Sequence, residues 1–523
     1  MEFNLRPYQK DAAERILSVI EEKSVAFQSP TGSGKTLIAL EVARHLGPTS
    51  VYSRTLSQYL SWERDCRKAG LSFAGLAGKD RFCLRPKVKD GDRVVSVTRC
   101  PLCPFFDRKF SRKQVSELGI VGFLERQRAA QKCAYSWIKL QQADVYLYTY
   151  PYYFFYRRLV KGNSLHVFDE AHNLMHVQDM VDVSITLQKI SRLRAAYAGT
   201  DVQDTVYAVL DALESWIEKG VKEGRKPPDL GSFHLEEVED HQLASFKRAL
   251  EKLDDPSYRL YVTPEGVVIK LMDPSSVLSK LNEDRWLLMS GTLPSKSYME
   301  KVWGLKDFEF ISINPFNPNL TFYWNRDLST RYTLRERNRE RYVKVVSSLR
   351  SPDGITLVLV PSYEVASWFK EVADYVEDSS SSVKSVPGAG LVVVVARGKL
   401  SEGVEFVKDG KSIVKRVVIV GIPYPNIGDA YSRDVLEFLT EKMGKRTMWF
   451  LLKEEASIII RQAIGRAVRS ESDSAEVFLL DRRMEPFLRD MGLSLKRVKI
   501  MRCAVPLSAE SMTERIKVPV PPV

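Results

Sequence analysis

One segment near the N-terminus carries residues of the kind that hold the phosphates of a nucleotide. A short apolar stretch at 25–27 leads into Ser29-Pro-Thr-Gly-Ser-Gly-Lys-Thr36, and a segment rich in Leu and Ala follows. Glycines at such a strand–loop–helix junction let backbone N–H groups surround phosphates, and the helix N-terminus adds a favourable dipole. We expect Lys35 to reach the β- and γ-phosphates and Thr36 to ligate Mg²⁺. The predicted nucleotide-contacting residues are Ser29, Thr31, Gly32, Ser33, Gly34, Lys35 and Thr36, together with Asp169.

A pair of carboxylates completes this chemistry. The apolar stretch 165–168 is followed at once by Asp169-Glu170-Ala-His172. At the end of a buried strand, Asp169 is expected to hold Mg²⁺ through the water shell of the metal, and Glu170 to act as the base for the attacking water. Acidic residues are also favoured at any helix N-terminus, which is the alternative interpretation. Together with the glycine-rich loop, the pair indicates hydrolysis of ATP with Mg²⁺.

A second set of polar residues lies near the end of the chain. Strand and helix patterns alternate there again, at 356–360, 364–376, 391–396 and 417–420, which is typical of another parallel α/β domain. Gln462, Arg466 and Arg469 are four and three residues apart in a segment with a helical pattern, so they should share one helix face. As catalytic residues they would contact a triphosphate held by the first domain. A solvated basic helix edge is the alternative.

Four cysteines between the two nucleotide motifs have the spacing of a metal site. Cys83, Cys100, Cys103 and Cys133 form the pattern C-x16-C-x2-C-x29-C. Four converging thiolates suit zinc or an iron–sulfur cluster, and the Cys-x-x-Cys spacing alone slightly favours zinc. Basic residues are dense around this set, which indicates contact with phosphates, or alternatively a solvated positive face. They are Lys79, Arg81, Arg85, Lys87, Lys89, Arg93, Arg99, Arg108, Lys109, Arg112 and Lys113.

Length and charge narrow the class of protein. The chain has 523 residues and a formal net charge of +12, which favours an anionic partner such as nucleic acid. At roughly 150 residues per domain, the length predicts three or four domains. No apolar signal segment opens the chain, and stretches such as 391–396 are far too short to span a bilayer. We therefore expect a soluble, cytoplasmic protein without a membrane partner, whose clustered cysteines bind metal rather than form disulfides.

Two further regions have a clear local pattern. The aromatic run from Tyr146 to Tyr156 could stack nucleic-acid bases, but it begins as an alternating strand and most of it is expected in the core. The segments 185–197, 205–220 and 242–253 have helical patterns, and 258–271 has the pattern of a hairpin that turns at 264–266.

Taken together, the motifs resemble those of superfamily-two helicases. The glycine-rich loop, Asp-Glu-Ala-His, Ser290-Gly-Thr-Leu293 and the segment 462–469 occur in family order along nearly the whole chain. More narrowly, the chain resembles the XPD branch, which includes the bacterial DinG proteins, and within it a minimal, archaeal-type member. This narrower resemblance depends on Arg6-Pro-Tyr-Gln9, Ser53-Arg-Thr-Leu56, Gly398 to Phe406 and Gly421-Ile-Pro-Tyr-Pro425. Glu405 stands where the family usually has Asp.

The resemblance implies an α/β fold with two RecA-like parallel-sheet motor domains. The first would carry an iron–sulfur insertion and a helical arch insertion, and the four cysteines would hold a 4Fe–4S cluster instead of zinc. The implied boundaries are 1–70, 144–178 and 258–314 for the first motor domain, 71–143 for the iron–sulfur cluster domain, 179–257 for the arch and 315–523 for the second motor domain.

The activity that the resemblance implies is ATP-dependent unwinding of DNA. Such a protein would move 5′→3′ on single-stranded DNA, with the cluster domain as a wedge at forked duplex DNA and with Ser290 and Thr292 coupling hydrolysis to movement. It would act as a monomer with repair-protein partners, in nucleotide excision repair or a related pathway of an archaeal or other prokaryotic cell. The alternatives are a translocase or remodeller without processive unwinding, and a structural subunit of a repair assembly. An RNA helicase of the Asp-Glu-Ala-His type is a weaker alternative, because the cysteine set has no role there.

Overall fold

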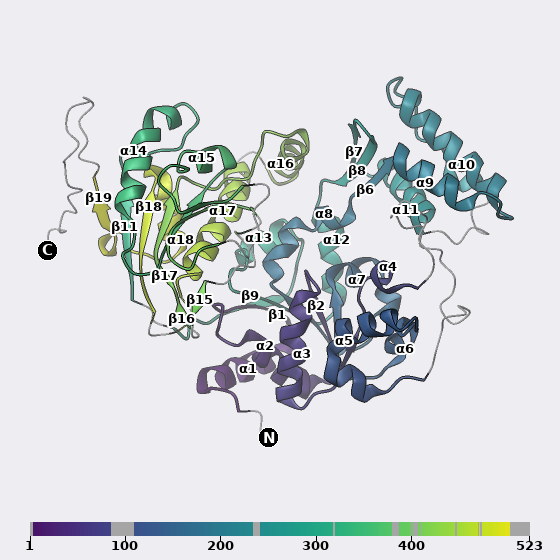
Figure 1. Cartoon of the computed structure of the whole chain (residues 1–523), viewed down its shortest axis with the longest axis horizontal. Coiled ribbons are helices and arrows are strands. Elements are labelled where there is room, and N and C mark those ends of the chain that lie inside the picture. Colours follow the sequence, from purple (N-terminus) through teal and green to yellow (C-terminus); the bar gives the residue numbers. More distant parts are fainter. Residues whose placement is uncertain are drawn as a thin grey trace.

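The chain folds into two lobes, each built on a seven-stranded sheet (Figure 1). The structure is a computed structural model that describes residues 4–84, 109–233, 241–316, 319–378, 386–398, 400, 406–408, 411–444, 447–468, 470 and 473–502. Every pairing in both sheets is parallel, as the alternation of strand and helix patterns predicts.

The first sheet has the strand order β10-β1-β9-β5-β2-β4-β3. Its strands are β1 (Ser24–Gln28), β2 (Thr49–Ser53), β3 (Phe73–Gly75), β4 (Val145–Thr149), β5 (Leu165–Asp169), β9 (Trp286–Ser290) and β10 (Phe308–Ser312). Because β1, β9 and β5 are neighbours and parallel, their carboxyl ends meet at one edge of the sheet. That edge therefore gathers the glycine-rich loop, Ser290 and Asp169 from distant parts of the sequence.

Helices cover both faces of this sheet, which explains why most residues of its strands are buried. They are α1 (Pro7–Ile20), α2 (Lys35–Leu46), α3 (Ser57–Ala69), α4 (Lys79–Phe82), α5 (Arg112–Ala129), α6 (Tyr135–Leu140), α7 (Tyr150–Phe155), α8 (Gln178–Val181), α12 (Ser275–Leu278) and α13 (Lys296–Lys301).

A helical excursion projects from the first lobe between β5 and β9 (Figure 1). It contains α9 (Leu187–Tyr197), α10 (Gln203–Ser215), a π-helical turn (Trp216–Gly220) and α11 (His241–Glu251), on a three-stranded antiparallel sheet of β6 (Val183–Thr186), β7 (Tyr258–Thr263) and β8 (Gly266–Leu271). The predicted hairpin is present as β7 and β8. The predicted helix at 185–197 starts two residues late, because Ile185 and Thr186 pair with β8 and Thr186 Oγ1 caps α9 by accepting the N–H of Lys189 at 3.2 Å.

The second sheet has the order β13-β14-β12-β17-β18-β11-β19. Its strands are β11 (Asn319–Asn325), β12 (Ile355–Val360), β13 (Tyr375–Val376), β14 (Gly390–Val395), β17 (Val414–Val420), β18 (Ser474–Leu480) and β19 (Lys499–Met501), and a small ribbon joins β15 (Val407–Lys408) to β16 (Lys411–Ser412). The helices of this lobe are α14 (Arg335–Ser348), α15 (Tyr363–Ser367), α16 (Ala430–Met443), α17 (Thr447–Gly465) and α18 (Glu485–Asp490).

Two helices of the second lobe end earlier than their patterns predict. The predicted helix at 364–376 was wrong beyond Ser367, because residues 375–376 instead pair with β14 at the edge of the sheet. Helix α17 ends at Gly465, a residue type common at helix ends, so Arg466 lies in the following turn. Arg466 nevertheless lines the same pocket as Gln462, and Arg469 lies outside the described residues.

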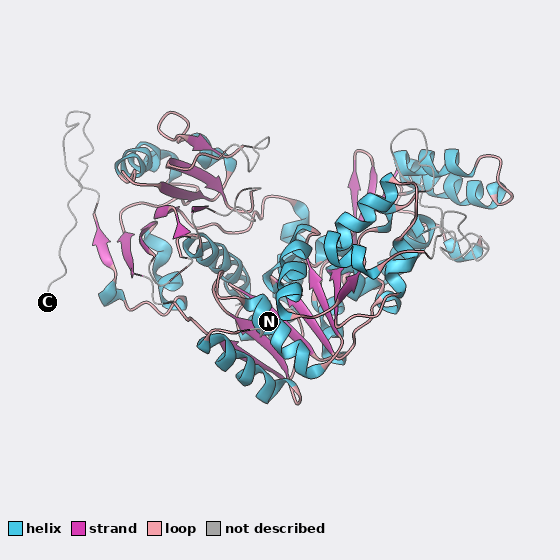
Figure 2. Cartoon of the chain, turned by 60° about the horizontal axis from the view of Figure 1, so that its bottom comes forward, coloured by secondary structure: helices cyan, strands magenta, loops and turns pink. Residues whose placement is uncertain are grey.

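The two lobes are set at an angle, like the arms of a V (Figure 2). Helices α16 and α17 connect them, because Leu436, Leu439 and Leu451 are buried in the hydrophobic core of the first lobe. Within the described part of the chain, no helix is both long and apolar enough to cross a membrane.

Candidate nucleotide-binding site

The glycine-rich loop is held in shape by its own residues and by helix α1. Ser33 donates to the Pro30 carbonyl from its backbone N–H at 3.2 Å and from its hydroxyl at 2.7 Å. Gln9 Nε2 donates to the Ser33 carbonyl at 2.8 Å. Gly32 and Gly34 have φ angles of 86° and 80°, and a Cβ on Gly34 would lie 2.2 Å from Gln9 Nε2. Glycine is therefore required at position 34 for both its backbone angle and its lack of a side chain.

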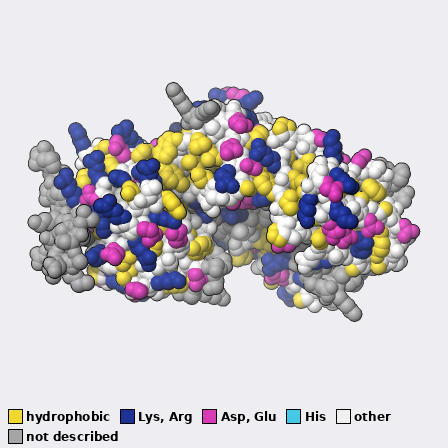
Figure 3. Space-filling model, turned by 90° about the horizontal axis from the view of Figure 1, so that it is seen from above, with side chains coloured by type: hydrophobic (Ala, Val, Ile, Leu, Met, Phe, Trp, Pro, Cys, Tyr) yellow, Lys and Arg dark blue, Asp and Glu magenta, His cyan; other side chains and the backbone are white. Residues whose placement is uncertain are grey.

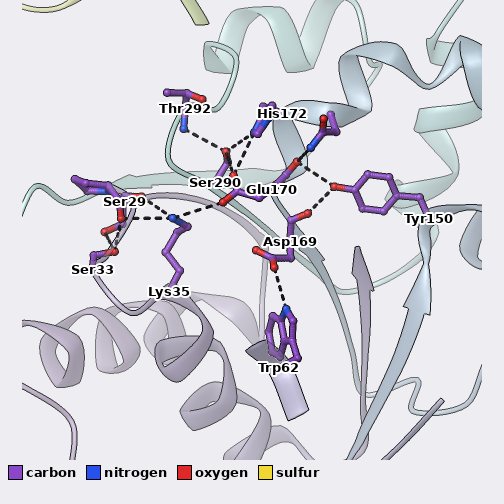
Figure 4. Close-up of polar contacts among 12 residues, drawn as sticks. Ser29, Ser33, Lys35, Trp62, Tyr150, Asp169, Glu170, His172, Ser290 and Thr292 are labelled. Atoms are coloured by element: carbon purple, nitrogen blue, oxygen red, sulfur yellow. Dashed lines mark hydrogen bonds and ion pairs between the residues drawn. The ribbon is translucent and has the colours of Figure 1, made fainter. Parts of the chain in front are cut away.

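Lys35, the first residue of α2, points its ammonium group into this loop (Figure 4). Its Nζ donates to the carbonyls of Ser29 and Pro30 at 3.2 and 3.4 Å and lies 4.0 Å from Glu170 Oε1. Lys35 is buried and Thr36, which follows it, is half-buried. The loop thus places a cation and helix-terminal N–H groups together, as binding of phosphates requires.

The acidic motif is held by residues from two other elements of the first lobe. Trp62 Nε1, on α3, donates to Asp169 Oδ2 at 2.9 Å. The Tyr150 hydroxyl, on α7, lies 2.6 and 3.0 Å from the carbonyl oxygens of Asp169 and Glu170. Asn173 donates to the Glu170 carbonyl from its backbone N–H at 3.0 Å and from Nδ2 at 2.9 Å. These bonds fix Glu170 in the left-handed conformation, with φ of 51° and ψ of 48°.

The two carboxylates lie in different electrostatic surroundings. Burial and then the charge of Glu170 raise the pKa of Asp169 above its ordinary value. Burial also acts to raise the pKa of Glu170, but the Lys35 ammonium and hydrogen bonding to His172 outweigh it and lower that pKa. Glu170 is therefore ionised at neutral pH and can accept a proton from water.

Ser290, at the carboxyl end of β9, connects the acidic motif to the Ser-Gly-Thr-Leu segment. Its Oγ donates to Glu170 Oε2 at 3.1 Å and lies 2.7 Å from His172 Nδ1. The backbone N–H of Thr292 donates to the same Oγ at 3.2 Å. A displacement of Glu170 or His172 would therefore be passed to residues 290–292.

A cleft lies between the two lobes beside this network. His172, Met175 and His176 line its first-lobe wall. The facing wall belongs to the second lobe, where Arg397 and Glu455 form an ion pair at 2.6 Å. The second-lobe lining residues are Leu357, Leu359, Val394, Arg397, Glu455, Ile458, Ile459, Gln462, Ala463 and Arg466.

Helix α17 also contacts the first lobe directly. Arg461 Nη2 donates to the Leu293 carbonyl at 3.0 Å, and its Nη1 donates to Gln28 Oε1 at 3.3 Å. Glu454 accepts from the backbone N–H of Ser295 at 2.5 Å and from its hydroxyl at 3.0 Å. Residues of the helix that carries Gln462 thus touch the segments that follow β1 and Ser290.

Several predicted site residues come together in this arrangement. Lys35 and Glu170 are in contact, and Asp169 lies beside them. Gln462 and Arg466 line the second-lobe wall of the cleft, and His172 lines the first-lobe wall. Arg469 and Glu405 lie outside the described residues.

Sequence reasoning missed Trp62 and Tyr150, which contact the acidic motif. Trp62 is 107 residues from Asp169 in the sequence, and no local pattern marks such a contact. Tyr150 belongs to the aromatic run of residues 146–156. Its position directly after a strand that ends at the same sheet edge was the available signal.

Most of that aromatic run is core, as predicted. Tyr148, Tyr150 and Phe154 are buried, whereas Phe155 and Tyr156 are 41% and 43% exposed. Within the run, only these last two described side chains are substantially open to solvent, so stacking on bases is restricted to them.

The cysteine set lies only partly within the described residues. Cys83, after α4, is half-buried, Cys133, before α6, is buried, and neither is in a disulfide. Cys100 and Cys103 lie outside the described residues, as do Arg85, Lys87, Lys89, Arg93, Arg99 and Arg108. Among the residues that the structure describes, no three metal-ligating side chains gather. The four-cysteine site remains a prediction.

The glycine-rich loop and the acidic motif, which lie beside the cleft, fit a nucleotide and its metal. A lysine ammonium and a glycine-rich helix terminus match phosphate oxygens, and a carboxylate on a neighbouring strand matches a hard divalent cation.

Comparison with known proteins identifies the family. The ATP-dependent DNA helicase XPD of Sulfolobus acidocaldarius is 30% identical to this chain, over 92% of the chain and 96% of its own length. The chain belongs to the XPD family of helicases. The ATP-dependent DNA helicase CHL1 of Yarrowia lipolytica is a more distant relative, 26% identical over 52% of this chain and 40% of its own length.

Family matches and solved structures agree with membership of the XPD family. The family described as type III restriction enzyme, res subunit, matches residues 2–56, DEAD_2 matches 52–190, and the helicase C-terminal domain matches 361–491. A solved XPD helicase has a TM-score of 0.70 and 25% identity, covering 96% of this chain and 100% of its own. The structure of S. tokodaii Xpd4, at 20% identity and a TM-score of 0.62, covers 95% of this chain and 100% of its own and shares the fold. The resemblance to XPD helicases and the two parallel-sheet α/β domains are confirmed.

Proposed function

We propose that this chain is an ATP-dependent DNA helicase that moves 5′→3′ along single-stranded DNA and unwinds duplex DNA. The observation that carries the proposal is the cleft between the lobes, which has His172 and His176 on one wall and Gln462 and Arg466 on the other. Opening and closing of such a cleft with each nucleotide moves two DNA-binding lobes relative to one another, which is what translocation requires.

The residues around the cleft have complementary roles in this proposal. The glycine-rich loop and Lys35 hold the phosphates of ATP, and Thr36 and Asp169 hold Mg²⁺. Mg²⁺ supplies neutralisation of the charge that develops on the phosphates. Glu170, ionised beside Lys35, accepts the proton of the attacking water. Arg466 reaches the γ-phosphate from the second lobe, and we assign the same role to Arg469.

The names of the relatives and the net charge of the chain support DNA as the nucleic acid along which the protein moves. The XPD and CHL1 relatives are named as DNA helicases, and the chain carries a net charge of +12. On the face seen in Figure 3, Lys and Arg side chains are spread over both lobes among acidic ones, without one continuous basic surface. We therefore place the DNA contacts along a path across both lobes rather than on a single patch, with long-range attraction supplied by the net charge.

We further propose that Cys83, Cys100, Cys103 and Cys133 hold a 4Fe–4S cluster in a domain at 71–143 that acts as the wedge. The remaining parts of this proposal are the motor domain at 1–70, 144–178 and 258–314, the arch at 179–257 and the second motor domain at 315–523. The protein would act as a monomer in DNA repair, with nucleotide excision repair the first pathway to test.

Anaerobic purification tests the cluster. We expect a brown protein with about four iron and four sulfide per chain, as a 4Fe–4S cluster requires. Cys100→Ser should lose the colour and strand displacement but keep ATPase activity stimulated by single-stranded DNA, because metal binding orders the residues around the cysteines, whereas each lobe has a large hydrophobic core built on its sheet. Cys503→Ser, outside the set, is the control and should keep both. Colourless protein with bound zinc would refute the cluster, and equal loss of ATPase and unwinding in Cys100→Ser would refute the wedge.

A further inference from the structure

Helix α3 brings a tryptophan to the nucleotide site from outside the helicase motifs. Trp62 is 1% exposed and lies on the same buried face of α3 as Tyr59 and Cys66. Its indole points at the acidic motif (Figure 4), and Nε1 donates to Asp169 Oδ2 at 2.9 Å. An indole N–H can only donate, and a buried one needs an acceptor, so this contact determines how Trp62 is placed.

The same contact determines how Asp169 is placed. A hydrogen bond from a neutral N–H to a carboxylate is charge-assisted and directional. It engages one oxygen, Oδ2, and among the described residues no other side chain is hydrogen-bonded to this carboxylate. The Asp169 backbone is held separately, since the Tyr150 hydroxyl bonds to its carbonyl oxygen. Trp62 is therefore the side chain that constrains the rotation of the carboxylate, alongside the backbone N–H of Glu170.

Helix α3 is itself well anchored, so it can hold a side chain accurately. Tyr59 Oη donates to the Leu76 carbonyl at 2.7 Å, and Glu63 Oε1 accepts the N–H of Ile120 at 2.7 Å. Just before the helix, Arg54 Nη1 donates to Asn173 Oδ1 at 2.7 Å, and Asn173 is four residues beyond Asp169. Contacts on several sides of α3 thus keep the indole at a fixed position relative to β5.

We propose that Trp62 is a positioning residue that orients the Asp169 carboxylate to receive the hydrated Mg²⁺ of bound ATP. Partners that orient the ligands of a metal strongly affect its affinity although they do not touch it. Trp62 would thus be required for binding of the metal, and not for binding of the phosphates, which Lys35 and the glycine-rich loop hold. The inference depends on the nucleotide site proposed above.

The matched pair Trp62→Phe and Trp303→Phe tests this role. Both tryptophans are buried in the first lobe, and both substitutions remove the same atoms. Trp303 Nε1 has no hydrogen-bond partner among the described residues, so its variant reports the loss of ring volume alone. The measurement is binding of a fluorescent, non-hydrolysable ATP analogue to the full chain, titrated with Mg²⁺ and repeated without it, with the unfolding midpoint recorded for each protein.

Trp62→Phe should raise the Mg²⁺ concentration needed for half-maximal binding by roughly tenfold or more, with binding in the absence of Mg²⁺ unchanged. Trp303→Phe should match the wild type both in the Mg²⁺ concentration for half-maximal binding and in binding without Mg²⁺. The same Mg²⁺ requirement in the two variants would overturn the role of Trp62. A wild-type protein that binds no analogue at any Mg²⁺ concentration would instead overturn the proposed nucleotide site itself.

Trp62→His provides a second test that does not depend on the Phe variant folding. The imidazole superposes on the five-membered ring of indole, and its Nε2–H takes the place of the indole Nε1–H. This variant loses ring volume but keeps the donor, so its Mg²⁺ requirement should stay close to that of the wild type. A Mg²⁺ requirement about tenfold or more above that of the wild type, in a folded Trp62→His protein, would overturn the proposal.

Discussion

Glu170 holds a backbone conformation that a non-glycine residue adopts only under constraint. Its φ of 51° costs on the order of 1–3 kcal/mol, and the contacts from Tyr150 and Asn173 to its carbonyl oxygen offset this. The result is a carboxylate that contacts Lys35 on one side and Ser290 on the other. The proposed base, the proposed phosphate-binding lysine and the segment after β9 are therefore one connected unit.

Removing the charge of Glu170 should separate binding from hydrolysis. Glu170→Gln keeps the shape of the side chain but cannot accept a proton, so DNA-stimulated ATPase turnover should fall by roughly 10²–10⁴-fold with nucleotide and DNA binding retained. Steady-state hydrolysis and equilibrium binding measure the two effects. Glu22→Gln, at an exposed position, is the control. More than about a tenth of the original turnover in Glu170→Gln would exclude Glu170 as the base.

The residues of this unit differ in how far the sequence reveals them. Lys35, Asp169 and Glu170 could be predicted because each lies in a short motif beside an apolar strand, and parallel neighbouring strands must bring those motifs to one edge. Trp62 and Tyr150 could not, because their contacts depend on how α3 and α7 pack over the sheet. Packing of this kind produces no recognisable pattern of residues in the local sequence.

At the scale of elements, a buried carboxylate of α3 caps part of helix α5. The helix breaks at Gly119, with φ of 74° and ψ of 173°, and the next N–H, of Ile120, donates to Glu63 Oε1 at 2.7 Å. A Cβ on Gly119 would lie 2.1 Å from Glu63 Oε2. Glu63 therefore caps the second half of α5, which leads toward Cys133, from the motor helix that also carries Trp62.

Glu63→Ala should loosen this junction. It leaves the buried N–H of Ile120 without its acceptor, which costs roughly 1–3 kcal/mol of local stability. Faster hydrogen exchange at Ile120 and its neighbours, with unchanged exchange in α2, would record the effect.

Glu63→Gln is the matched control, because it keeps an acceptor for the N–H of Ile120. Burial raises the pKa of Glu63, so the ionised form of Glu63 is disfavoured in the fold. Glu63→Gln should therefore be at least as stable as the wild type at neutral pH. Equal exchange in the Ala and Gln variants would contradict the capping role.

The elements themselves were predictable where their patterns are long. The apolar runs that became β5, β12, β14 and β17 identify buried parallel strands, and the hairpin of β7 and β8 has a clear turn. The short strands β6 and β13 were missed, because a few residues with strand propensity acquire their structure only from the edge they pair with. The end of α17 at Gly465 was missed because a helical pattern continues past it.

At the scale of the whole molecule, the two lobes meet through α17. Arg461 is half-buried with its Nε enclosed, and desolvation lowers the pKa of its guanidinium, so its bonds to the Leu293 carbonyl and Gln28 Oε1 are made by a partly desolvated cation. Gln28 Oε1 also accepts the N–H of Leu293 at 2.9 Å. One arginine of the second lobe thus joins the end of β1, just before the glycine-rich loop, to the segment that follows Ser290.

Arg461→Met should weaken the communication between the lobes. It removes both bonds with a similar side-chain volume, so the cleft should close less accurately and DNA-stimulated turnover should fall by up to about 100-fold, with each lobe still folded. Arg489→Met is the control, because that arginine pairs with Glu485 on the surface at 2.7 Å and its side chain is 70% exposed. Equal turnover in the two variants would remove Arg461 from the coupling of the lobes.

The central claim is that ATP hydrolysis in the cleft drives directional unwinding of DNA. Strand displacement tests it most directly, on duplexes that carry a single-stranded tail at either the 5′ or the 3′ end, with ATP and with a non-hydrolysable analogue. We expect displacement of the 5′-tailed duplex with ATP only, and none by Glu170→Gln although it binds the same DNA. Strand displacement with the analogue, or by Glu170→Gln, would contradict the claim. So would the absence of displacement by a wild-type protein that hydrolyses ATP. Preferential displacement of the 3′-tailed duplex would show that the protein moves in the opposite direction, 3′→5′.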